Sequence, residues 1–227
     1  MCGRYTQTKS GEVLAKTFNL VETPDVPPRY NIAPSQPILA VAAPEGARQL
    51  RAFQWGLVPS WSKDPTIGNR MINARAETVA EKPSFRAAFK RRRCLIVADG
   101  FYEWKKIDGQ KTKQPFYIHL KGHAPFGFAG LWEHWEGGDG SYLETCTILT
   151  TAPNALMEPI HNRMPVIVHP DDYNTWLDPE RGEFKQDRGL LESLLRPYEA
   201  ERMEAYPVST EVNSPRNESR DCLEPLA

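Results

Sequence analysis

The chain has 227 residues, of which 40% are hydrophobic, and a formal net charge of −1, so it can bury a sizeable core in one domain. Its apolar runs are shorter than the roughly 20 residues of a membrane-spanning helix, and the N-terminus lacks the pattern of a secretory signal. The four cysteines are scattered and form no CxxC pair. This spacing indicates neither a zinc site nor a disulfide framework, and it favours a reducing cytoplasm.

The charge is unevenly distributed along the chain. Residues 1–121 carry a formal net charge of +10, and residues 122–227 carry −11. Such asymmetry suits a polyanion as the partner of the first half. Alternatively, the two halves fold together and neutralise each other, and the sequence leaves both interpretations open.

Short strands dominate the elements that the hydrophobic pattern predicts. In chain order we predict a helix at 11–20, a proline-rich loop at 23–37, strands at 37–43 and 48–57, a loop at 59–70, a helix at 84–92, strands at 95–98, 101–106, 115–120, 126–132, 142–150 and 165–168, helices at 171–177 and 187–195, and a strand at 206–209. These elements predict an α+β fold, a β-rich single domain over residues 1–227 with a curved sheet or small barrel as its core, flanked by short helices. The chain from about residue 214 is polar and is predicted to be a tail.

Cys2 directly follows the initiator methionine. Removal of Met1 would leave Cys2 with a free α-amine and a thiol two carbons apart. The α-amine has a pKa of about 7.7–8.0, against about 10.4 for lysine, so more of it is a neutral nucleophile at pH 7. An aldehyde suits this pair, because the amine forms a Schiff base and the thiol then closes a thiazolidine ring on the same carbon. The alternative is that Cys2 has no chemical role.

Three stretches offer the amide, the carboxylic acid and the histidine that such chemistry would need. Asn73 lies in the stretch INARAE, Glu103 in DGFYEW and His161 in PIHNRMP. Carboxyl and imidazole groups are common general acids and bases. Each residue also has a structural interpretation: Asn73 as a turn or capping residue, Glu103 as the outward position of a strand, and His161 as a partner of a backbone carbonyl.

Other polar residues receive no site role. His119 and His123 have a spacing compatible with metal ligands, but a strand is predicted to end there, so we interpret both as surface residues. We expect no metal site and no cofactor. The basic run at residues 90–93 is interpreted as a solvated helix end, where positive charge suits the helix dipole.

Six stretches spread over nearly the whole chain also form a recognisable set. They are MCGRY at 1–5, YNIAP at 30–34, WGLVPSW at 55–61, NARAET at 73–78, ADGFYEW at 98–104 and IHNRMP at 160–165. In this order they resemble the SRAP family, the SOS response-associated peptidases, which are also described as abasic-site processing proteins.

The resemblance implies a function in the DNA damage response. Members of the family bind single-stranded DNA and crosslink covalently to abasic sites through the N-terminal cysteine, which shields the lesion. Carried onto this sequence, Cys2 is the nucleophile, Asn73 holds the sugar or the Cys2 backbone, and Glu103 acts in acid–base steps. His161 would move protons in the β-elimination (AP lyase) and reversal chemistry. The family also implies an autopeptidase activity that removes Met1.

The resemblance further implies DNA-binding residues. Arg4, Arg75 and Arg163 would contact phosphates beside the lesion. Trp61 and Trp104 would stack on bases, as aromatic side chains do in single-strand grooves.

Two positions depart from the family pattern. Asn162 stands where the family often has Asp, so an orienting charge for the preceding histidine is absent. Ser62 stands where a second tryptophan often follows, which would weaken stacking on one side.

Two other functions remain open. One is a non-covalent single-stranded DNA-binding module. The other is an N-terminal-cysteine amidohydrolase or glutaminase, which shares only the opening Met-Cys-Gly and usually continues with isoleucine instead of Arg4. For the leading hypothesis we expect a monomer in the cytoplasm, associated with the nucleoid when bound to DNA. Its partner is then single-stranded DNA containing abasic sites, without a membrane.

Overall fold

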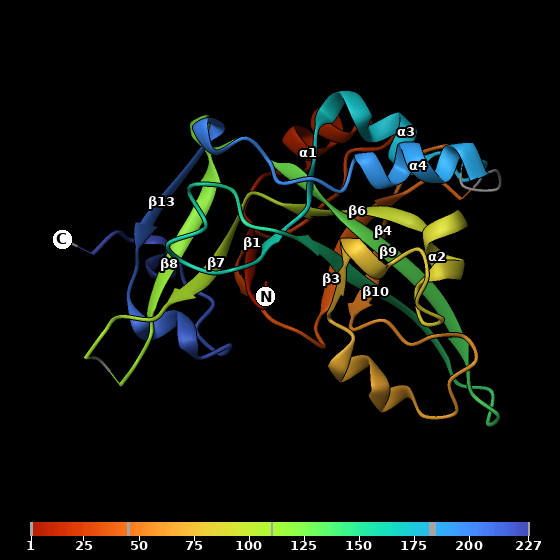
Figure 1. Ribbon diagram of the computed structural model, residues 1–227, viewed down its shortest axis with the longest axis horizontal. Helices are drawn as coiled ribbons and strands as arrows, with labels where there is room; N and C mark the ends of the chain where they lie inside the picture. The colour runs from red at the N-terminus through yellow and green to blue at the C-terminus, as the bar shows by residue number, and fades with distance from the viewer. Residues whose placement is uncertain (1, 45, 110, 182–184, 227) are drawn as a thin grey trace.

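The computed structural model describes residues 2–44, 46–109, 111–181 and 185–226, and it combines a closed barrel, an open sheet and a few short helices (Figure 1). The predicted α+β, β-rich fold with a small barrel is therefore confirmed. Within the described residues, no helix has the length and apolar character needed to cross a membrane.

Five strands close the barrel in the order β10-β4-β3-β6-β9, with β9 pairing back to β10. Only the β4–β10 pair in this ring is parallel. The strands are β3 (Pro37–Ala42), β4 (Gln49–Trp55), β6 (Arg93–Ala98), β9 (Phe126–Glu136) and β10 (Tyr142–Thr151).

The sequence of β6 shows why this barrel is buried on both sides. Its side chains alternate between two hydrophobic clusters, as the period of two of a strand dictates. Cys94 and Ile96 belong to the cluster that also holds Cys2, whereas Leu95 and Val97 pack with residues of the helices. A strand buried on both faces carries a continuous apolar run, which is what made β6 recognisable in the sequence.

The open sheet has the order β13-β8-β7-β1-β2 and is antiparallel throughout. The chain passes from the barrel strand β6 into β7 of this sheet through a single residue, Asp99. The strands are β1 (Tyr5–Gln7), β2 (Arg29–Ile32), β7 (Gly100–Lys105), β8 (Gln114–Leu120) and β13 (Met203–Pro207).

Three short strands extend the barrel and carry segments of the site. β5 (Asn73–Arg75) runs parallel to β10, β11 (Met164–Pro165) runs antiparallel to β10, and β12 (Ile167–Val168) pairs with β9. The C-terminal half of β10 therefore brings residues 73–75 and 164–165 to one place.

Short helices complete the structure. Three of them, α1, α3 and α4, lie together over one side of the barrel, and α2 lies at its end (Figure 1). The α-helices are α1 (Gly11–Phe18), α2 (Arg86–Arg91), α3 (Tyr173–Leu177) and α4 (Lys185–Ser193). The 3₁₀ helices are η1 (Pro65–Arg70), η2 (Ala76–Thr78), η3 (Lys121–His123), η4 (Pro170–Asp172), η5 (Ala200–Arg202), η6 (Thr210–Asn213) and η7 (Arg220–Leu223).

The polar C-terminal segment packs against the open sheet. The Glu218 carboxylate accepts hydrogen bonds from the backbone N–H groups of Tyr30 and Asn31, at 2.6 and 2.9 Å. Cys222 in the same segment is buried. These contacts explain why β2 forms inside a stretch that the prolines predict to be a loop.

The interpretation of His119 as a surface residue is wrong. Its side chain is 2% exposed, and its ring stacks on those of Tyr117 and His123, with the centroid of His123 at 4.2 Å. The Nδ1 atom donates to the carbonyl oxygen of Leu120 at 2.8 Å. The following turn folds back over the strand and covers the ring, whereas His123 itself is exposed.

We predict that Gly100→Ala destabilises the fold. A Cβ atom at this first residue of β7 would lie 2.1 Å from the hydroxyl oxygen and 2.3 Å from the Cζ atom of Tyr117. Overpacking of this kind should lower the free energy of unfolding by about 3 kcal/mol, measured by urea denaturation. Gly138→Ala is the matched control, since its Cβ would meet no atom within 4 Å. Equal midpoints for the two variants would contradict this account of the β7–β8 packing.

Candidate active site

Cys2 lies just before β1 and is completely buried in the cluster that fills the barrel. Its carbonyl oxygen accepts a hydrogen bond from Nδ2 of Asn73 at 2.8 Å. Its Sγ atom lies 3.9 Å from the carbonyl oxygen of Arg4. Met1, whose removal the sequence hypothesis requires, lies outside the described residues.

The position of Cys2 depends on how β1 is attached to the rest of the sheet. The buried Asp99 carboxylate accepts a hydrogen bond from Oγ1 of Thr6 at 2.5 Å. It also accepts from N and Oγ1 of Thr8 at 2.7 and 2.5 Å. One carboxylate at the junction of barrel and sheet therefore fixes the strand that carries Cys2.

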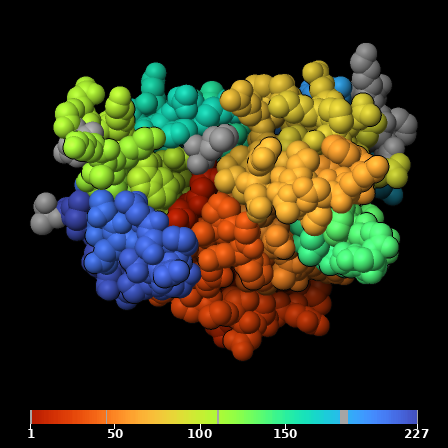
Figure 2. Space-filling view, turned by 90° about the horizontal axis from the view of Figure 1, so that it is seen from below, coloured from red at the N-terminus to blue at the C-terminus, as the bar shows by residue number. Residues whose placement is uncertain are grey.

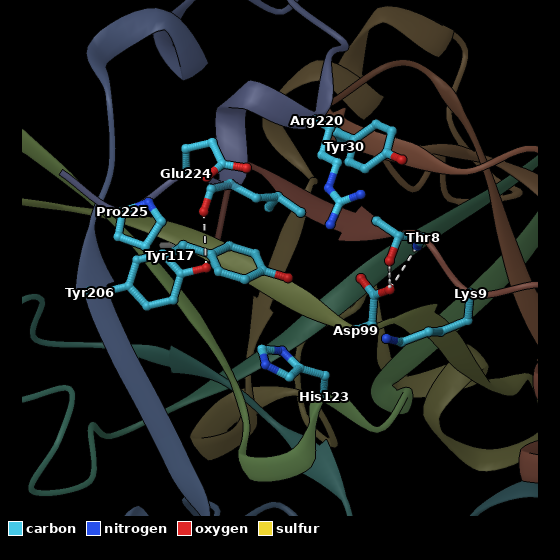
Figure 3. A pocket seen from close by; sticks show the side chains of 11 residues that line it. Thr8, Lys9, Tyr30, Asp99, Tyr117, His123, Tyr206, Arg220, Glu224 and Pro225 are labelled. Carbon is cyan, nitrogen blue, oxygen red and sulfur yellow. Dashed lines mark hydrogen bonds between the residues drawn. The ribbon is translucent and has the colours of Figure 1, made fainter. Parts of the chain in front are cut away.

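The Thr8–Asp99 contacts form part of the wall of a polar cavity of about 510 Å³ (Figure 3). Tyr117, Tyr206 and Arg220 also line this cavity. None of the four predicted catalytic residues is among its lining residues. The cavity beside the anchoring contacts of β1 is therefore lined by other residues than Cys2, Asn73, Glu103 and His161.

Glu103 projects from β7 toward Cys2. Phe101, two residues earlier on the same side of the strand, belongs to the barrel cluster, whereas Tyr102 and Trp104 pack on the other side with the C-terminal segment. Glu103 is 2% exposed, so the alternative interpretation as an outward strand position does not hold. The Oε2 atom of Glu103 lies 3.9 Å from Nε2 of His161.

His161 reaches this point from a turn that follows β10. Its backbone N–H donates to the carbonyl oxygen of Met157 at 2.8 Å. On the ring, Nδ1 accepts the backbone N–H of Arg163 at 3.1 Å. The same Nδ1 atom lies 3.2 Å from the carbonyl oxygen of Arg163, so the Arg163 backbone holds this edge of the ring while Nε2 faces Glu103. The imidazole is partly exposed, so it can also meet a ligand.

The electrostatics of the thiol follow from this arrangement. Burial raises the pKa of the Cys2 thiol well above its usual range, and the negative charge of Glu103 raises it further. The sulfur is therefore a protonated thiol at neutral pH, and any reaction that adds it to a carbon must pass its proton to a neighbouring base.

Asn73 has a second, unused hydrogen-bonding group. While its Nδ2 binds Cys2, its Oδ1 is buried and has no hydrogen-bond partner among the described residues. The pairing of Asn73 with Ile148 of β10 fixes this amide beside the cysteine. An unpaired buried acceptor carries a desolvation cost that a hydroxyl group of a ligand would relieve.

Two of the predicted phosphate-binding arginines are engaged within the protein. The half-buried Arg4 donates to the carbonyl oxygens of Val212 and Asn213 and to Oδ1 of Asn31, and burial lowers its pKa. The guanidinium of Arg163 is bound by acceptors on η2 and β10.

The other predicted DNA-binding residues are more open. Arg75 is exposed, and Trp61 is 60% exposed. Trp104 is partly buried, and its Nε1 donates to Oδ1 of Asn213 at 2.7 Å. In Figure 2, N-terminal residues (red) reach the surface among residues of the barrel (orange), the β7–β8 region (lime) and the C-terminal segment (blue).

Sequence reasoning missed three residues that hold the site together. Asn31 binds Arg4, Glu77 binds Arg163, and Asp99 anchors β1. Each lies inside one of the six stretches singled out in the sequence. Their location in these stretches could have drawn attention to them. Their roles were not visible, because the residues that they contact are distant in the chain.

Known proteins resemble this chain over its whole length. Residues 1–215 match the family described as SOS response associated peptidase (SRAP). The chain is 48% identical over 227 residues to "Abasic site processing protein YoqW" of Bacillus subtilis (strain 168), covering 99% of both. It is 33% identical to "Abasic site processing protein HMCES" of Xenopus tropicalis, covering 86% of this chain and 65% of that protein.

Solved structures agree with these matches. A crystal structure of a protein from Bacteroides thetaiotaomicron superposes with a TM-score of 0.87 at 26% identity, over 100% of both chains. A phage-related protein from Bordetella bronchiseptica superposes with a TM-score of 0.72 at 31% identity, over 91% of this chain and 94% of its own. From its sequence and its fold, the chain belongs to the SOS response associated peptidase (SRAP) family.

Proposed function

We propose that this protein processes abasic sites in single-stranded DNA, and that Cys2 forms a covalent thiazolidine crosslink with the lesion after Met1 is removed. Membership of the SRAP family and the names of the relatives support abasic-site processing. The observation that supports the covalent mechanism is that three separate segments meet here: Asn73 binds the Cys2 backbone, the charge of Glu103 acts on the Cys2 thiol, and His161 lies beside Glu103.

The chemistry begins with the ring-opened abasic sugar, whose C1′ is an aldehyde. The α-amine of Cys2 adds to C1′, and loss of water gives a Schiff base. The thiol then adds to the same carbon, the C–S bond forms, and the thiol proton is transferred so that the ring nitrogen ends as an amine. The net reaction joins protein and sugar with release of one water molecule, and it needs no oxidant, metal or cofactor.

The neighbouring groups have distinct roles in these steps. Glu103 first passes the amine proton to the departing hydroxyl as the Schiff base forms. It then takes the proton from the thiol, whose raised pKa prevents spontaneous ionisation, and passes it to the ring nitrogen. His161, linked to Glu103 at 3.9 Å, exchanges protons between this carboxylate and the solvent side. Asn73 fixes the Cys2 backbone through Nδ2 and offers Oδ1 to a sugar hydroxyl.

The same groups support an associated AP lyase activity. In the Schiff base, a base that removes a C2′ proton allows the 3′ phosphate to leave by β-elimination. His161 is the partly exposed base beside the site, so we assign this step to it. Closure of the thiazolidine competes with elimination because it removes the C=N bond. Removal of Met1 by the protein itself, acting as an autopeptidase, is part of the same proposal.

Single-stranded DNA would approach across Trp61 and Arg75, which are exposed to solvent. Arg4, Trp104 and Arg163 would contact the strand closer to the lesion. We place the protein in the cytoplasm as a monomer that joins the nucleoid when bound to DNA.

We predict that Cys2→Ala abolishes the crosslink. Wild-type protein mixed with an abasic single-stranded oligonucleotide should give a heat-stable species of reduced mobility on a denaturing gel. The variant lacks the thiol that closes the ring, so this species should be absent, while binding to an intact strand persists. Cys222→Ala, which changes a buried cysteine in the C-terminal segment, is the control and should crosslink normally. A Cys2→Ala protein that crosslinks like the wild type would refute the mechanism.

Glu103→Gln should separate catalysis from binding. Glutamine keeps the size of the side chain but cannot accept the thiol proton, so the crosslinking rate at saturating abasic DNA should fall about 100-fold. The Kd for an intact strand should stay within about twofold. Glu204→Gln, at a half-exposed carboxylate on β13, is the comparison variant. Equal rates for both variants would remove Glu103 from the acid–base steps.

Trp61→Ala should weaken the binding of an intact single strand by about 1–3 kcal/mol, because base stacking on the exposed ring is lost. Fluorescence anisotropy at several salt concentrations measures this. The variant should retain the slope of log Kd against log salt, which reports the phosphate contacts. Leu190→Ala, a partly exposed apolar residue on α4, is the control. Unchanged affinity in Trp61→Ala would exclude this ring from the DNA path.

A further inference from the structure

We propose that Glu77 is a positioning residue of this site, which acts through Arg163 to hold His161 in the orientation that faces Glu103. This inference rests on the proposed function, because it concerns the same proton-transfer step. It assigns a role to a carboxylate that itself has no contact with Cys2 among the described contacts.

The first step of the argument is the clamp on the Arg163 side chain. Nη1 and Nη2 of Arg163 donate to Oε1 and Oε2 of Glu77 at 2.5 and 2.9 Å, a bidentate pair. Nη2 also donates to the carbonyl oxygen of Thr150 at 2.6 Å. Glu77 lies on η2, immediately after β5, and Thr150 lies on β10. Acceptors on two elements therefore fix one guanidinium group.

The second step links this clamp to the imidazole. The backbone N–H and carbonyl oxygen of Arg163 lie 3.1 and 3.2 Å from Nδ1 of His161, so the Arg163 backbone holds this edge of the ring. Nε2 is the atom that lies 3.9 Å from the Glu103 carboxylate. The backbone of Arg163 thus orients the imidazole, and the Glu77 clamp restrains the side chain of the same residue.

The third step is that this ion pair differs from an ordinary surface pair. Exposed ion pairs contribute little to stability, but a bidentate arginine–carboxylate pair has a defined geometry. The Arg163 side chain is 18% exposed, although the Glu77 side chain is 51% exposed. The hydrogen bonds from Arg163 hold the pKa of Glu77 below its usual value, so the clamp remains charged in mildly acidic solution. The next residue, Met164, pairs with Thr151 of β10, so the loop between His161 and β11 is short and transmits the restraint.

The experiment measures the first-order crosslinking rate at saturating abasic DNA for wild type, Glu77→Gln and Glu81→Gln. Glutamine at position 77 loses the charge and one of the two acceptors, so the imidazole is no longer held in one orientation and the rate should fall about tenfold. Glu81 is a matched control, because it is exposed on the same segment and its carboxylate pairs with Arg188, at 3.5 Å, away from Arg163. Its variant should crosslink at the wild-type rate.

Further readouts separate positioning from a general loss of structure. The melting temperature should be unchanged in Glu77→Gln, whereas the pH profile of the rate should shift. Glu77→Asp keeps the charge and should recover part of the rate. In a His161→Ala background, Glu77→Gln should cause no further loss, because residues that act through one another are not additive.

The outcomes distinguish this inference from the proposed function. A wild-type protein that forms no adduct refutes the proposed function itself. A wild-type protein that crosslinks, with a Glu77→Gln variant of equal rate and pH profile, refutes only the role of Glu77. Equal slowing of the wild-type and His161→Ala proteins by Glu77→Gln would also refute it, because Glu77 would then act independently of the imidazole.

Discussion

The buried Asp99 carboxylate is the contact on which the site depends, because it fixes the N-terminal strand to the junction of the two sheets. Without it, β1 would be held only by two short ladders, with two paired positions on β7 and two on β2. Hydrogen bonds from Thr6 and Thr8 convert these short ladders into a defined attachment. Since Cys2 lies a few residues before these threonines and Glu103 a few residues after Asp99, the same contact helps to set the distance between Cys2 and Glu103.

Burial determines how the thiol can react. In most cysteine enzymes a lowered pKa supplies the thiolate, but here burial and the charge of Glu103 raise the pKa of Cys2. A buried thiol is protected from oxidation and from adventitious alkylation until a substrate arrives. In the proposed mechanism its proton leaves through the carboxylate beside it, which connects Glu103 and, through it, His161 to the sulfur. Glu77 is a further carboxylate near the site. In our proposal it affects the proton path only by keeping the imidazole in one orientation.

Local pattern predicted most of the strands and helices, since the apolar runs of β6 and the amphipathic face of α1 are visible in the sequence alone. It failed where distant partners decide the structure. β2 forms inside a proline-rich segment because β1 and Glu218 supply its hydrogen bonds, and His119 is buried because the turn after β8 covers it. For the site, motifs pointed to Asn73, Glu103 and His161; in the structure Asn73 binds the Cys2 backbone, and His161 lies 3.9 Å from Glu103, whose charge acts on the Cys2 thiol. The Glu77–Arg163 pair joins positions 86 residues apart, so no local pattern could indicate it.

The most direct test of the central claim is the intact mass of the purified protein before and after incubation with an abasic single-stranded oligonucleotide. The account predicts a free protein that is lighter than its full sequence by one methionine residue. It predicts an adduct whose mass equals that of this protein plus the oligonucleotide, less one water molecule. A protein that retains Met1 and still forms the adduct, or one that loses Met1 and forms none, would contradict the role of the Cys2 aminothiol.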